Sequence, residues 1–405
     1  MSITSLVQAA RSAGVSSSGT GYWPISGDLK TNATESYAQA YIGASLTARY
    51  LLVNISSNAN GVTVRTRKNA ANGGLSISAS AGETGTFEDT SGSDSLASAD
   101  LYNFQTVPTS GSVVIKQFSV TFDHATAGIA FPSHVPSLSL TFNATYYYGF
   151  GGEAANNTSE AGAKFTIRYA ANVTRLVFVC SGNTVNATST VRTRKNGGNG
   201  AQSVSIGASA TGRFTDTTNT DSLVSGDAFN FQVVTGGTSG TMTPTLCECQ
   251  LLATSTGYTY FEMVAGKQPG QALNANNTYY LPVQGFLYSN TTEADVQLKT
   301  RFAFAGAFFF ANITANSVNG ASTLRSRKNG ANGALSVSVG ASATGTFEDQ
   351  TDSETYLSTD SINVQIATGG SSGTTTITLA GWSGRTTLSV TIDIDWVDAL
   401  EALAT

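Results

Sequence analysis

Val64-Arg-Thr-Arg-Lys-Asn69 recurs nearly unchanged as Val191-Arg-Thr-Arg-Lys-Asn196 and Leu324-Arg-Ser-Arg-Lys-Asn329 in a chain of 405 residues. The offsets between the copies are 127 residues (191 − 64) and 133 residues (324 − 191). Periods of about 20 to 50 residues indicate solenoids or propellers, whereas longer units are whole domains repeated by duplication. The sequence therefore predicts three copies of one domain, each with its own core.

The match extends well beyond the hexapeptides. Downstream it continues without gaps to Gln105, Gln232 and Gln365. Upstream it is looser and passes through three related tetrapeptides, Asn32 to Glu35, Asn157 to Glu160 and Asn290 to Glu293. A gapless match of this length is not a chance event, and it gives copies of about 105 to 120 residues, within the usual size of a domain.

Each copy has the pattern of short strands joined by tight turns. Leu335-Ser-Val-Ser-Val339 alternates apolar and polar residues, which is typical of a half-buried strand. The segments from Lys68 to Gly73, Lys195 to Gly200 and Lys328 to Gly333 place Asn and Gly between two such strands, so each is predicted to be a hairpin loop. Several short strands per copy predict an all-β sandwich.

Composition limits the classes of partner. Charged residues make up 12% of the chain and the net charge is −5, so there is no basic field to hold nucleic acid or an anionic membrane. Met1 to Arg11 lack the pattern of a secretion signal, and the apolar run Phe302 to Ala311 is about half the length that spans a bilayer. We expect synthesis in the cytoplasm, no nucleic-acid partner and no membrane insertion.

The order of these signals resembles the complement and tumour-necrosis-factor jelly-roll superfamily, with Leu223-Val-Ser-Gly-Asp-Ala-Phe-Asn-Phe231 as the best copy. That resemblance implies three tandem jelly-roll β-sandwich domains arranged as a pseudo-trimer. The low charge and the abundant Gly, Ser, Thr and Asn also resemble bacteriophage virion proteins. The implied division is an N-terminal segment 1–19, repeat 1 at 20–123, a linker 124–137, repeat 2 at 138–253, a linker 254–271, repeat 3 at 272–392 and a tail 393–405.

Two terminal segments carry patterns of their own. Ser2 to Gly14 is compatible with a short helix, and Thr386 to Trp396 alternates apolar and polar residues like an additional strand.

Basic residues are concentrated in the hexapeptides. One interpretation is that they pair with acidic loops such as Glu88-Asp89, Asp216 and Glu348-Asp349; the other is a surface for an anionic ligand or a partner. We carry the second as a candidate interface made of Arg65, Arg67, Lys68, Arg192, Arg194, Lys195, Arg325, Arg327 and Lys328.

Other chemistry-bearing residues favour structural roles. Asp89, Asp94, Asp100 and their counterparts could offer oxygen ligands to Ca²⁺, although turns and salt bridges are the favoured interpretation. Cys247 and Cys249 lack the further ligands of a zinc site, and the two histidines, His124 and His134, lie in a segment that the other copies do not repeat. We therefore predict no catalytic site, no metal site and no cofactor.

These observations favour a non-enzymatic structural protein of a bacteriophage virion. We expect it to decorate the capsid or to form a head or tail fibre or spike, and to bind other virion proteins such as the major capsid protein. The alternative is a receptor- or carbohydrate-binding adhesion module, in which exposed tyrosines such as Tyr146, Tyr147, Tyr148, Tyr279 and Tyr280 stack on sugars. Packing in the core or at an interface is the favoured role of these tyrosines.

Overall fold

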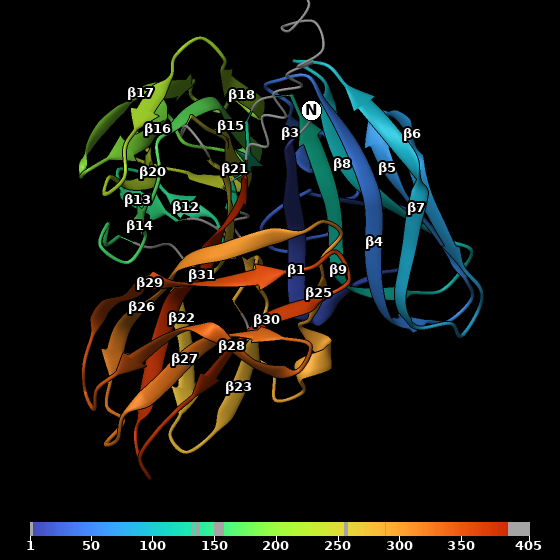
Figure 1. The fold of residues 1–405 in the computed structure, drawn as a ribbon. Helices are drawn as coiled ribbons and strands as arrows, with labels where there is room; N and C mark the ends of the chain where they lie inside the picture. The colour runs from blue at the N-terminus through green and yellow to red at the C-terminus, as the bar shows by residue number, and fades with distance from the viewer. Residues whose placement is uncertain are drawn as a thin grey trace, which may run out of the picture.

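A computed structural model describes residues 3–125, 127–131, 133–134, 138–149, 158–254, 258–287 and 289–387. The described chain is almost entirely β-structure and forms three sandwiches, which run in Figure 1 from blue and cyan through green to orange and red. Each sandwich consists of two antiparallel sheets of four principal strands. We refer to the sandwiches as domains 1, 2 and 3 in chain order.

Domain 1 shows the topology most plainly, because the chain crosses between its two sheets. The order in the first sheet is β1-β9-β4-β7 and in the second β2-β8-β5-β6, with β3 added beside β8. Eight strands in two sheets with this order form a jelly roll. The strands are β1 (Ile3–Ser17), β2 (Gly21–Trp23), β3 (Ala40–Tyr41), β4 (Leu46–Asn58), β5 (Val62–Lys68), β6 (Ala71–Ala79), β7 (Gly85–Leu96), β8 (Leu101–Pro108) and β9 (Val113–His124).

Domain 2 repeats this order with its outer strands broken into short pieces. β10, β11 and β12 together take the place of β1 beside β21, and β18 and β19 take the place of β7 beside β15. The second sheet is β13-β20-β16-β17, with β14 beside β20. The strands are β10 (Ile129–Ala130), β11 (Ser133–His134), β12 (Leu140–Thr141), β13 (Thr145–Tyr148), β14 (Phe165–Thr166), β15 (Ala171–Asn183), β16 (Ser189–Lys195), β17 (Gly198–Ile206), β18 (Gly212–Asp216), β19 (Asp221–Leu223), β20 (Ala228–Val234) and β21 (Thr241–Ala253).

Domain 3 has long outer strands again. Its sheets are β24-β22-β31-β26-β29 and β23-β30-β27-β28, with β25 beside β30. The prediction of three jelly-roll β-sandwiches is therefore confirmed. The strands are β22 (Tyr258–Asn274), β23 (Thr278–Leu281), β24 (Gly285–Phe286), β25 (Leu298–Lys299), β26 (Phe304–Asn316), β27 (Ser322–Lys328), β28 (Ala331–Val339), β29 (Gly345–Tyr356), β30 (Ser361–Ala367) and β31 (Thr374–Thr387). Short 3-10 helices, η1 (Glu35–Tyr37) and η2 (Glu293–Asp295), precede β3 and β25.

The predicted hairpins are confirmed, and their turns explain the Asn-Gly signal. Lys68 pairs with Ala71 across a two-residue turn, Asn69-Ala70, whose φ angles are 50° and 63°. The other turns are Asn196-Gly197 and Asn329-Gly330, also with both φ angles positive. Two central residues with positive φ match the right-handed twist of a hairpin, which is why Asn and Gly recur here.

Period-two burial builds a core inside each sandwich. In β28, Leu335, Val337 and Val339 are buried while the intervening serines are exposed. The core of domain 1 centres on Trp23, Phe104 and Phe118, with the two phenylalanine rings stacked at 4.9 Å. Each domain has such a cluster, and the clusters also include residues of neighbouring domains, such as Phe310 in the cluster of domain 2 and Leu6 in that of domain 3. Apolar burial therefore stabilises both the three copies and their association.

Two predictions about connecting segments need correction. Residues 3–17, where Ser2 to Gly14 suggested a short helix, form strand β1, because this segment pairs along β9. Residues within 124–137 and 254–271, expected to be linkers, contribute β10, β11 and most of β22, which pair with β21 and β31. The exact division between domains stays a prediction, and the strand proposed for Thr386 to Trp396 lies largely outside the described residues, as does the tail 393–405.

The three domains close into a ring. β1 contacts β10, β22 and β24, and β10 contacts β22, so the first strands of all three domains meet at the centre. Figure 1 shows β1 at this position, between the sandwiches. Domain 1 contacts domain 2, domain 2 contacts domain 3, and domain 3 contacts domain 1, as expected for head-to-tail interfaces whose rotation closes. The described chain is therefore a pseudo-trimer within one polypeptide.

Candidate functional site

The three domain interfaces are built from equivalent elements. At each one, the strand pair β4/β7, β15/β18 or β26/β29 of one domain faces the segment around β3, β14 or β25 of a neighbouring domain. We call them the 3–1, 1–2 and 2–3 interfaces. Equivalent positions can be compared across them, because the repeat is gapless along these strands.

A buried ion pair crosses two of the interfaces. Arg301 of domain 3 pairs with Glu88 of domain 1, and Arg168 of domain 2 pairs with Glu348 of domain 3. Their side chains are between 13% and 22% exposed, so the charges are largely withdrawn from water. Burial lowers the pKa of both arginines, yet their guanidinium groups stay charged because the normal value is far above neutrality.

Aromatic contacts reinforce the 2–3 interface. Tyr169 of domain 2 stacks on Tyr260 of domain 3 at 4.7 Å, and Phe165 packs against Phe310 at 5.2 Å. Such ring pairs contribute about 0.5 to 1.5 kcal/mol beyond the area that they bury. The 2–3 interface therefore combines an ion pair with aromatic packing.

The 1–2 interface departs from the pattern. Gly43 and Thr215 occupy the positions of the arginine and the glutamate, so no equivalent ion pair can form. Instead, Arg213 of domain 2 reaches across and donates to the carbonyl oxygens of Ser36 and Gln39, at 2.9 Å each. The ring is thus closed by two different kinds of polar contact.

A β-bulge shapes each interface. The middle strands β4, β15 and β26 contain a residue with left-handed backbone: Tyr50 at φ 56°, Arg175 at 62° and Phe308 at 58°. Non-glycine residues adopt this conformation only where the surroundings enforce it, and bulges turn a side chain away from the regular pleat. The Arg175 guanidinium consequently lies over the ring of Tyr41 in domain 1, at 5.7 Å.

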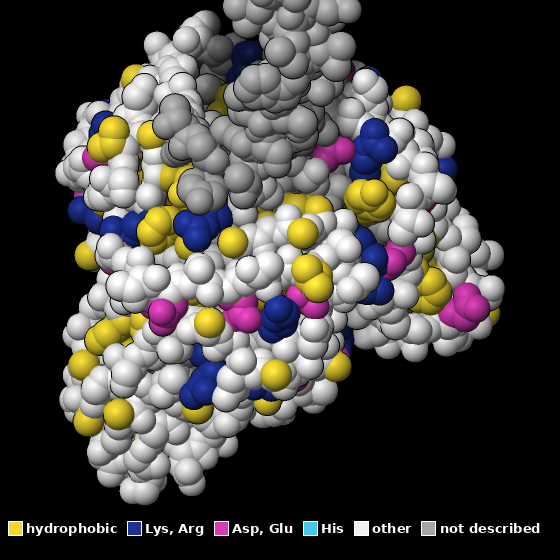
Figure 2. Space-filling model, viewed as in Figure 1, with side chains coloured by type: hydrophobic (Ala, Val, Ile, Leu, Met, Phe, Trp, Pro, Cys, Tyr) yellow, Lys and Arg dark blue, Asp and Glu magenta, His cyan; other side chains and the backbone are white. Residues whose placement is uncertain are grey.

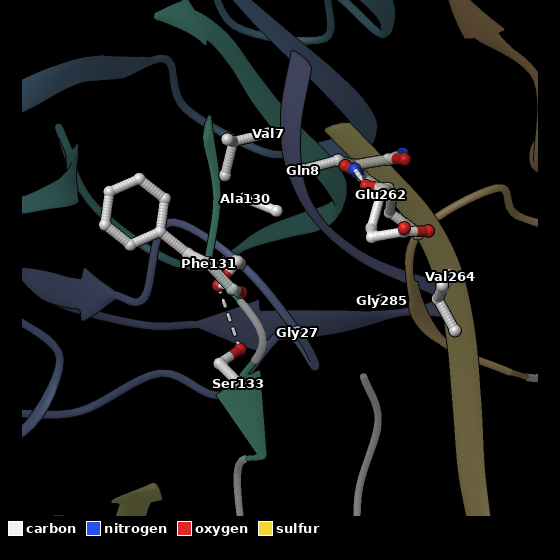
Figure 3. A pocket seen from close by; sticks show the side chains of 11 residues that line it. Val7, Gln8, Gly27, Ala130, Phe131, Ser133, Glu262, Val264 and Gly285 are labelled. Carbon is white, nitrogen blue, oxygen red and sulfur yellow. Dashed lines mark hydrogen bonds between the residues drawn. The ribbon is translucent and has the colours of Figure 1, made fainter. Parts of the chain in front are cut away.

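Where the three domains meet lies a small cavity of about 30 Å³ lined by both polar and apolar side chains, shown in Figure 3. All three domains line it, through Gln8, Ser133, Glu262 and their neighbours. Ser26 donates to the Ser133 hydroxyl across 2.9 Å, and both Gln8 amide atoms are buried without a protein partner. A space of this size beside an unpaired amide suits an ordered water and is too small for a substrate.

Two carboxyl groups are buried near this axis. Glu262 lines the cavity, and Glu248 pairs in register with Ser133 at its edge. Burial raises the pKa of each to about 8, because desolvation disfavours the charged form more than their hydrogen bonds and nearby arginines favour it. Both groups therefore carry a proton at neutral pH, and the sequence singled out neither of them.

The nine residues of the candidate interface divide into paired and partly exposed positions. Arg67, Arg194 and Arg327 each bind a glutamate of their own domain, with Nε to Oε1 distances of 2.8 to 3.0 Å, and also bind the hairpin turn. The glutamates are Glu35, Glu160 and Glu293 rather than the acidic loops named from the sequence. These three arginines therefore hold the hairpins onto their own domains.

The lysines and the remaining arginines also have positions within their own domains. Lys68 donates to the carbonyl oxygen of Ser95 and pairs with Asp100, and Lys195 and Lys328 repeat this arrangement. Arg65 donates to Gln105, while the Nε atoms of Arg192 and Arg325 are buried. Their role as a partner surface stays a prediction.

The first aspartate of each repeated acidic set accepts hydrogen bonds from backbone N–H groups at a turn. Asp89 accepts backbone N–H groups from Ser76, Ser91 and Gly92, and Asp216 and Asp349 do the same in the other domains. These bonds lower the pKa of each aspartate against the opposing effect of burial, which is the larger single contribution. Within the described residues, no group of three His, Cys, Asp or Glu side chains is placed to hold a metal ion.

Other candidate residues are positioned for packing. All three cysteines are buried as free thiols. His124 accepts a hydrogen bond from the backbone N–H of Ala127, and the side chain of His134 lies outside the description. Tyr146 and Tyr148 are 4% and 0% exposed, so the idea that they stack on sugars is wrong for these two. Their strand, β13, points them into the core of domain 2.

Sequence reasoning missed the residues that close the ring. Arg213 was identifiable in principle, since Thr86 and Thr346 occupy its position in the other copies. A charged residue in one copy of an otherwise neutral position signals a contact that the other copies lack. Figure 2 shows acidic and basic side chains interspersed on the face that it presents. No patch of a single charge sign on that face therefore marks these positions.

Comparisons with known proteins assign this chain to no family. No family model and no curated protein matches the chain. Solved structures that resemble it include one of Sulfolobus turreted icosahedral virus, at 13% identity, covering 92% of this chain and 90% of that chain, with a TM-score of 0.18. Another, from an archaeal virus described by its triple jelly roll fold and turret assembly, is 15% identical and covers 94% and 90%, with a TM-score of 0.18.

Those TM-scores are too low to support a shared fold, so the assignment of the jelly-roll fold rests on the strand order alone. Among the described residues, no helix has the length and apolar character needed to cross a membrane.

Proposed function

We propose that the protein is a non-enzymatic structural component of a virion, in which one chain supplies a complete three-sided unit. The observation that carries this proposal is the closed ring of three jelly rolls, joined by cross-domain contacts of Arg301, Arg168 and Arg213. Jelly rolls recur in viral capsid proteins and in lectins, so the fold alone does not decide between them.

The geometry supports assembly rather than small-molecule chemistry. The axial cavity has a volume of about 30 Å³, and two of its lining side chains, Ser26 and Gln284, make hydrogen bonds across domain boundaries. Because the three domains are joined in one chain, docking onto neighbours does not require three separate molecules to lose translational and rotational freedom. The ring can therefore dock as a rigid body. In finer detail, we propose that it decorates a bacteriophage capsid or forms a head or tail fibre or spike.

The hairpins that carry the nine basic residues are proposed as one contact surface toward other virion proteins, including the major capsid protein. Support comes from the lysine side chains, since those of Lys68 and Lys195 are 36% exposed while the neighbouring arginines are mostly buried. The more specific resemblance to the complement and tumour-necrosis-factor superfamily stays a prediction.

Cross-linking mass spectrometry on purified particles tests the proposal. Cross-links from Lys68, Lys195 or Lys328 to a major capsid protein support decoration, and a location confined to a tail tip supports the adhesion alternative. Absence of the chain from purified particles would overturn both. Sedimentation of the isolated chain is an independent check, because a self-contained ring should behave as a 41.8 kDa particle and a chain that needs partners to complete its ring should not.

A further inference from the structure

Each domain has a row of four polar side chains across the outer face of its second sheet. In domain 1, Tyr22 of β2 lies opposite Gln105 of β8. Gln105 in turn lies opposite Arg65 of β5, and Arg65 lies opposite Ser76 of β6. Residues paired directly across a sheet share one face, and the next residue along β5, Val64, is buried in the core. The row therefore lies on the face that is directed away from the core.

The other two domains repeat this row without a change of residue. The serines of the rows are exposed, and the tyrosines and arginines are partly exposed. At the domain interfaces, by contrast, equivalent positions differ between the copies, as Arg213, Thr86 and Thr346 do. The row is therefore a feature of the domain that all three copies have kept at the surface. Its equivalents are Tyr147, Gln232, Arg192 and Ser203 in domain 2, and Tyr280, Gln365, Arg325 and Ser336 in domain 3.

The arginine of each row has no carboxylate partner among the residues that the structure describes. Nε of Arg65 donates to Oε1 of Gln105 across 2.8 Å, and this acceptor is uncharged. The Nε atoms of Arg192 and Arg325 are buried and have no acceptor in the described chain. A buried donor without an acceptor is unfavourable, and a guanidinium group carries its charge at any physiological pH. Each row thus presents a positive charge that the described chain does not neutralise.

A second arginine on the same strand shows how this face binds a carboxylate. Arg67 lies two residues beyond Arg65, so both side chains belong to the same face of the sheet. Nε of Arg67 donates to Oε1 of Glu35 across 2.9 Å, and Nη2 donates to Oε2 across 3.1 Å. The other two domains repeat this bidentate contact. The fold therefore supplies a carboxylate to one arginine of each pair and leaves the other arginine without one.

The other charged groups around the row of domain 1 already have partners. Arg67 pairs with Glu35, and Lys68 pairs with Asp100. Asp89, which lies at the edge of the sheet, accepts backbone N–H and hydroxyl donors with its two oxygens. The arginine of the row consequently carries the charge that lacks a counterion. The tyrosine and serine hydroxyls of the row can also donate hydrogen bonds, so the row suits an anion.

We propose that each row binds the carboxylate of a glutamate or aspartate side chain in an acidic segment of a neighbouring protein. The planar fork of the arginine matches the two oxygens of a carboxylate, as the contact between Arg67 and Glu35 shows. This inference deepens the contact surface proposed above and rests on it for the partner, another virion protein. Of the nine basic residues, Arg65, Arg192 and Arg325 make the contact, and the other six hold the hairpins.

Three equivalent sites on one chain also allow a multivalent contact. Figure 1 shows β5, β16 and β27 in three different sandwiches, away from β1 at the centre of the ring. A partner assembly that presents three acidic segments at a matching spacing can occupy the three rows together. Its second and third contacts are then intramolecular, so three weak carboxylate contacts add up to a much tighter association.

Nuclear magnetic resonance of the full chain with isotope-labelled arginine tests the proposal, with acetyl-Ser-Glu-Ser amide as the ligand. The side-chain N–H signals of Arg65, Arg192 and Arg325 should shift, and the uncharged acetyl-Ser-Gln-Ser amide should bind about tenfold more weakly. Arg325→Gln should remove one of the three shifting signals. Arg49→Gln is the matched control, because it removes the same charge from an exposed arginine that already pairs with Asp123, and all three signals should still shift.

Combining Arg65→Gln, Arg192→Gln and Arg325→Gln separates binding from a purely structural role. The combined variant should keep the circular dichroism of the folded chain and lose the peptide response. If it does not fold, each single variant still reports whether two sites remain. Equal responses to the two peptides, or three unchanged sites in a single variant, would overturn the proposal. Absence of the chain from purified particles would instead overturn the virion role, and the peptide titration would be unaffected by that result.

Discussion

Ser383 on β31 donates its hydroxyl to the carboxyl group of Glu262 on β22, with 3.1 Å between Oγ and Oε1. The two side chains are 2% and 4% exposed and lie beside the central axis of the ring. The polar contacts of this carboxyl group do not replace the hydration of a carboxylate, so burial raises the pKa of Glu262 to about 8. The ring is therefore assembled around neutral carboxylic acids at pH 7.

Stability should fall as the pH rises through the window set by these groups. An unfolded glutamate has a pKa near 4.5, while the folded pKa of Glu248 and of Glu262 is about 8. Between these values the folded chain holds protons that the unfolded chain has released, so the free energy of unfolding decreases with pH. In Glu262→Gln, the melting temperature should decline less between pH 5 and pH 9 than in the wild type.

The exposed Glu83 offers the control for that experiment. Glu83→Gln makes the same chemical change on a turn and should leave the slope of melting temperature against pH unaltered. Parallel slopes for the wild type and Glu262→Gln would contradict the assignment of this pH dependence to the axis.

Removing the hairpin ion pair of domain 3 should be costly. Arg327 binds Glu293 through both Nε and Nη2, at 2.8 and 3.1 Å, and its side chain is 10% exposed. Arg327→Gln should lower the free energy of unfolding by about 2 kcal/mol, because it breaks charge-assisted bonds and leaves a carboxylate largely buried. Arg327→Lys should recover only part of this loss, since lysine cannot form the bidentate contact.

Arg49 supplies the comparison, because it pairs with Asp123 at 3.1 Å but its side chain is 49% exposed. Arg49→Gln should cost less than about 1 kcal/mol in urea denaturation, as is usual for solvent-exposed pairs. A similar loss for both arginine-to-glutamine variants would show that burial of the Arg327 pair is not what stabilises it.

Glycine should stabilise the turn of the first hairpin. Ala70 has φ 63°, whereas the equivalent positions are Gly197 and Gly330, each at 77°. A left-handed conformation costs an L-residue about 1 to 2 kcal/mol, part of which glycine loses again through the greater freedom of its unfolded chain. Ala70→Gly should therefore gain about 0.5 to 1 kcal/mol in urea denaturation. Gly330→Ala should change stability in the opposite direction, and a loss in both variants would refute the argument.

The thiols should be inert in the folded chain. Cys180, Cys247 and Cys249 are at most 1% exposed, and burial raises the pKa of each. Since the thiolate is the reactive form, Ellman's reagent should label no native thiol and all three in denaturant. Thr90→Cys, at an exposed position, should react at once and report that the assay works. Rapid labelling of a native cysteine would indicate local opening of β15 or β21.

The sequence predicted those features that depend on neighbours within a few residues. The hairpin between β5 and β6 is of this kind, because Asn69 and the alternation on either side determine the turn and the buried face together. Because the same hairpin sequence occurs three times, the prediction for one hairpin applied to all three domains. Jelly-roll topology followed only from resemblance, since the pairing of β1 with β9 joins residues more than 100 positions apart, such as Ser5 and Phe122.

Non-local contacts account for what was not predicted. Ser2 to Gly14 has no strong strand pattern of its own, and residues 3–14 are extended because β9 and the neighbouring domains offer them partners. Likewise, the partners of Arg213 lie 174 and 177 positions away along the chain. No local pattern reports contacts of this range, although the departure of Arg213 from Thr86 and Thr346 was visible in the repeat.

Because the three interfaces differ, the ring does not have exact threefold symmetry. A homotrimer presents the same surface after every turn of 120°. In this chain, Arg213 fills one junction, while Thr86 and Thr346 leave the other two open with different linings. A neighbour that recognises one junction would consequently bind in a single rotational setting, so a symmetric location in an assembly could acquire a unique orientation from one polypeptide.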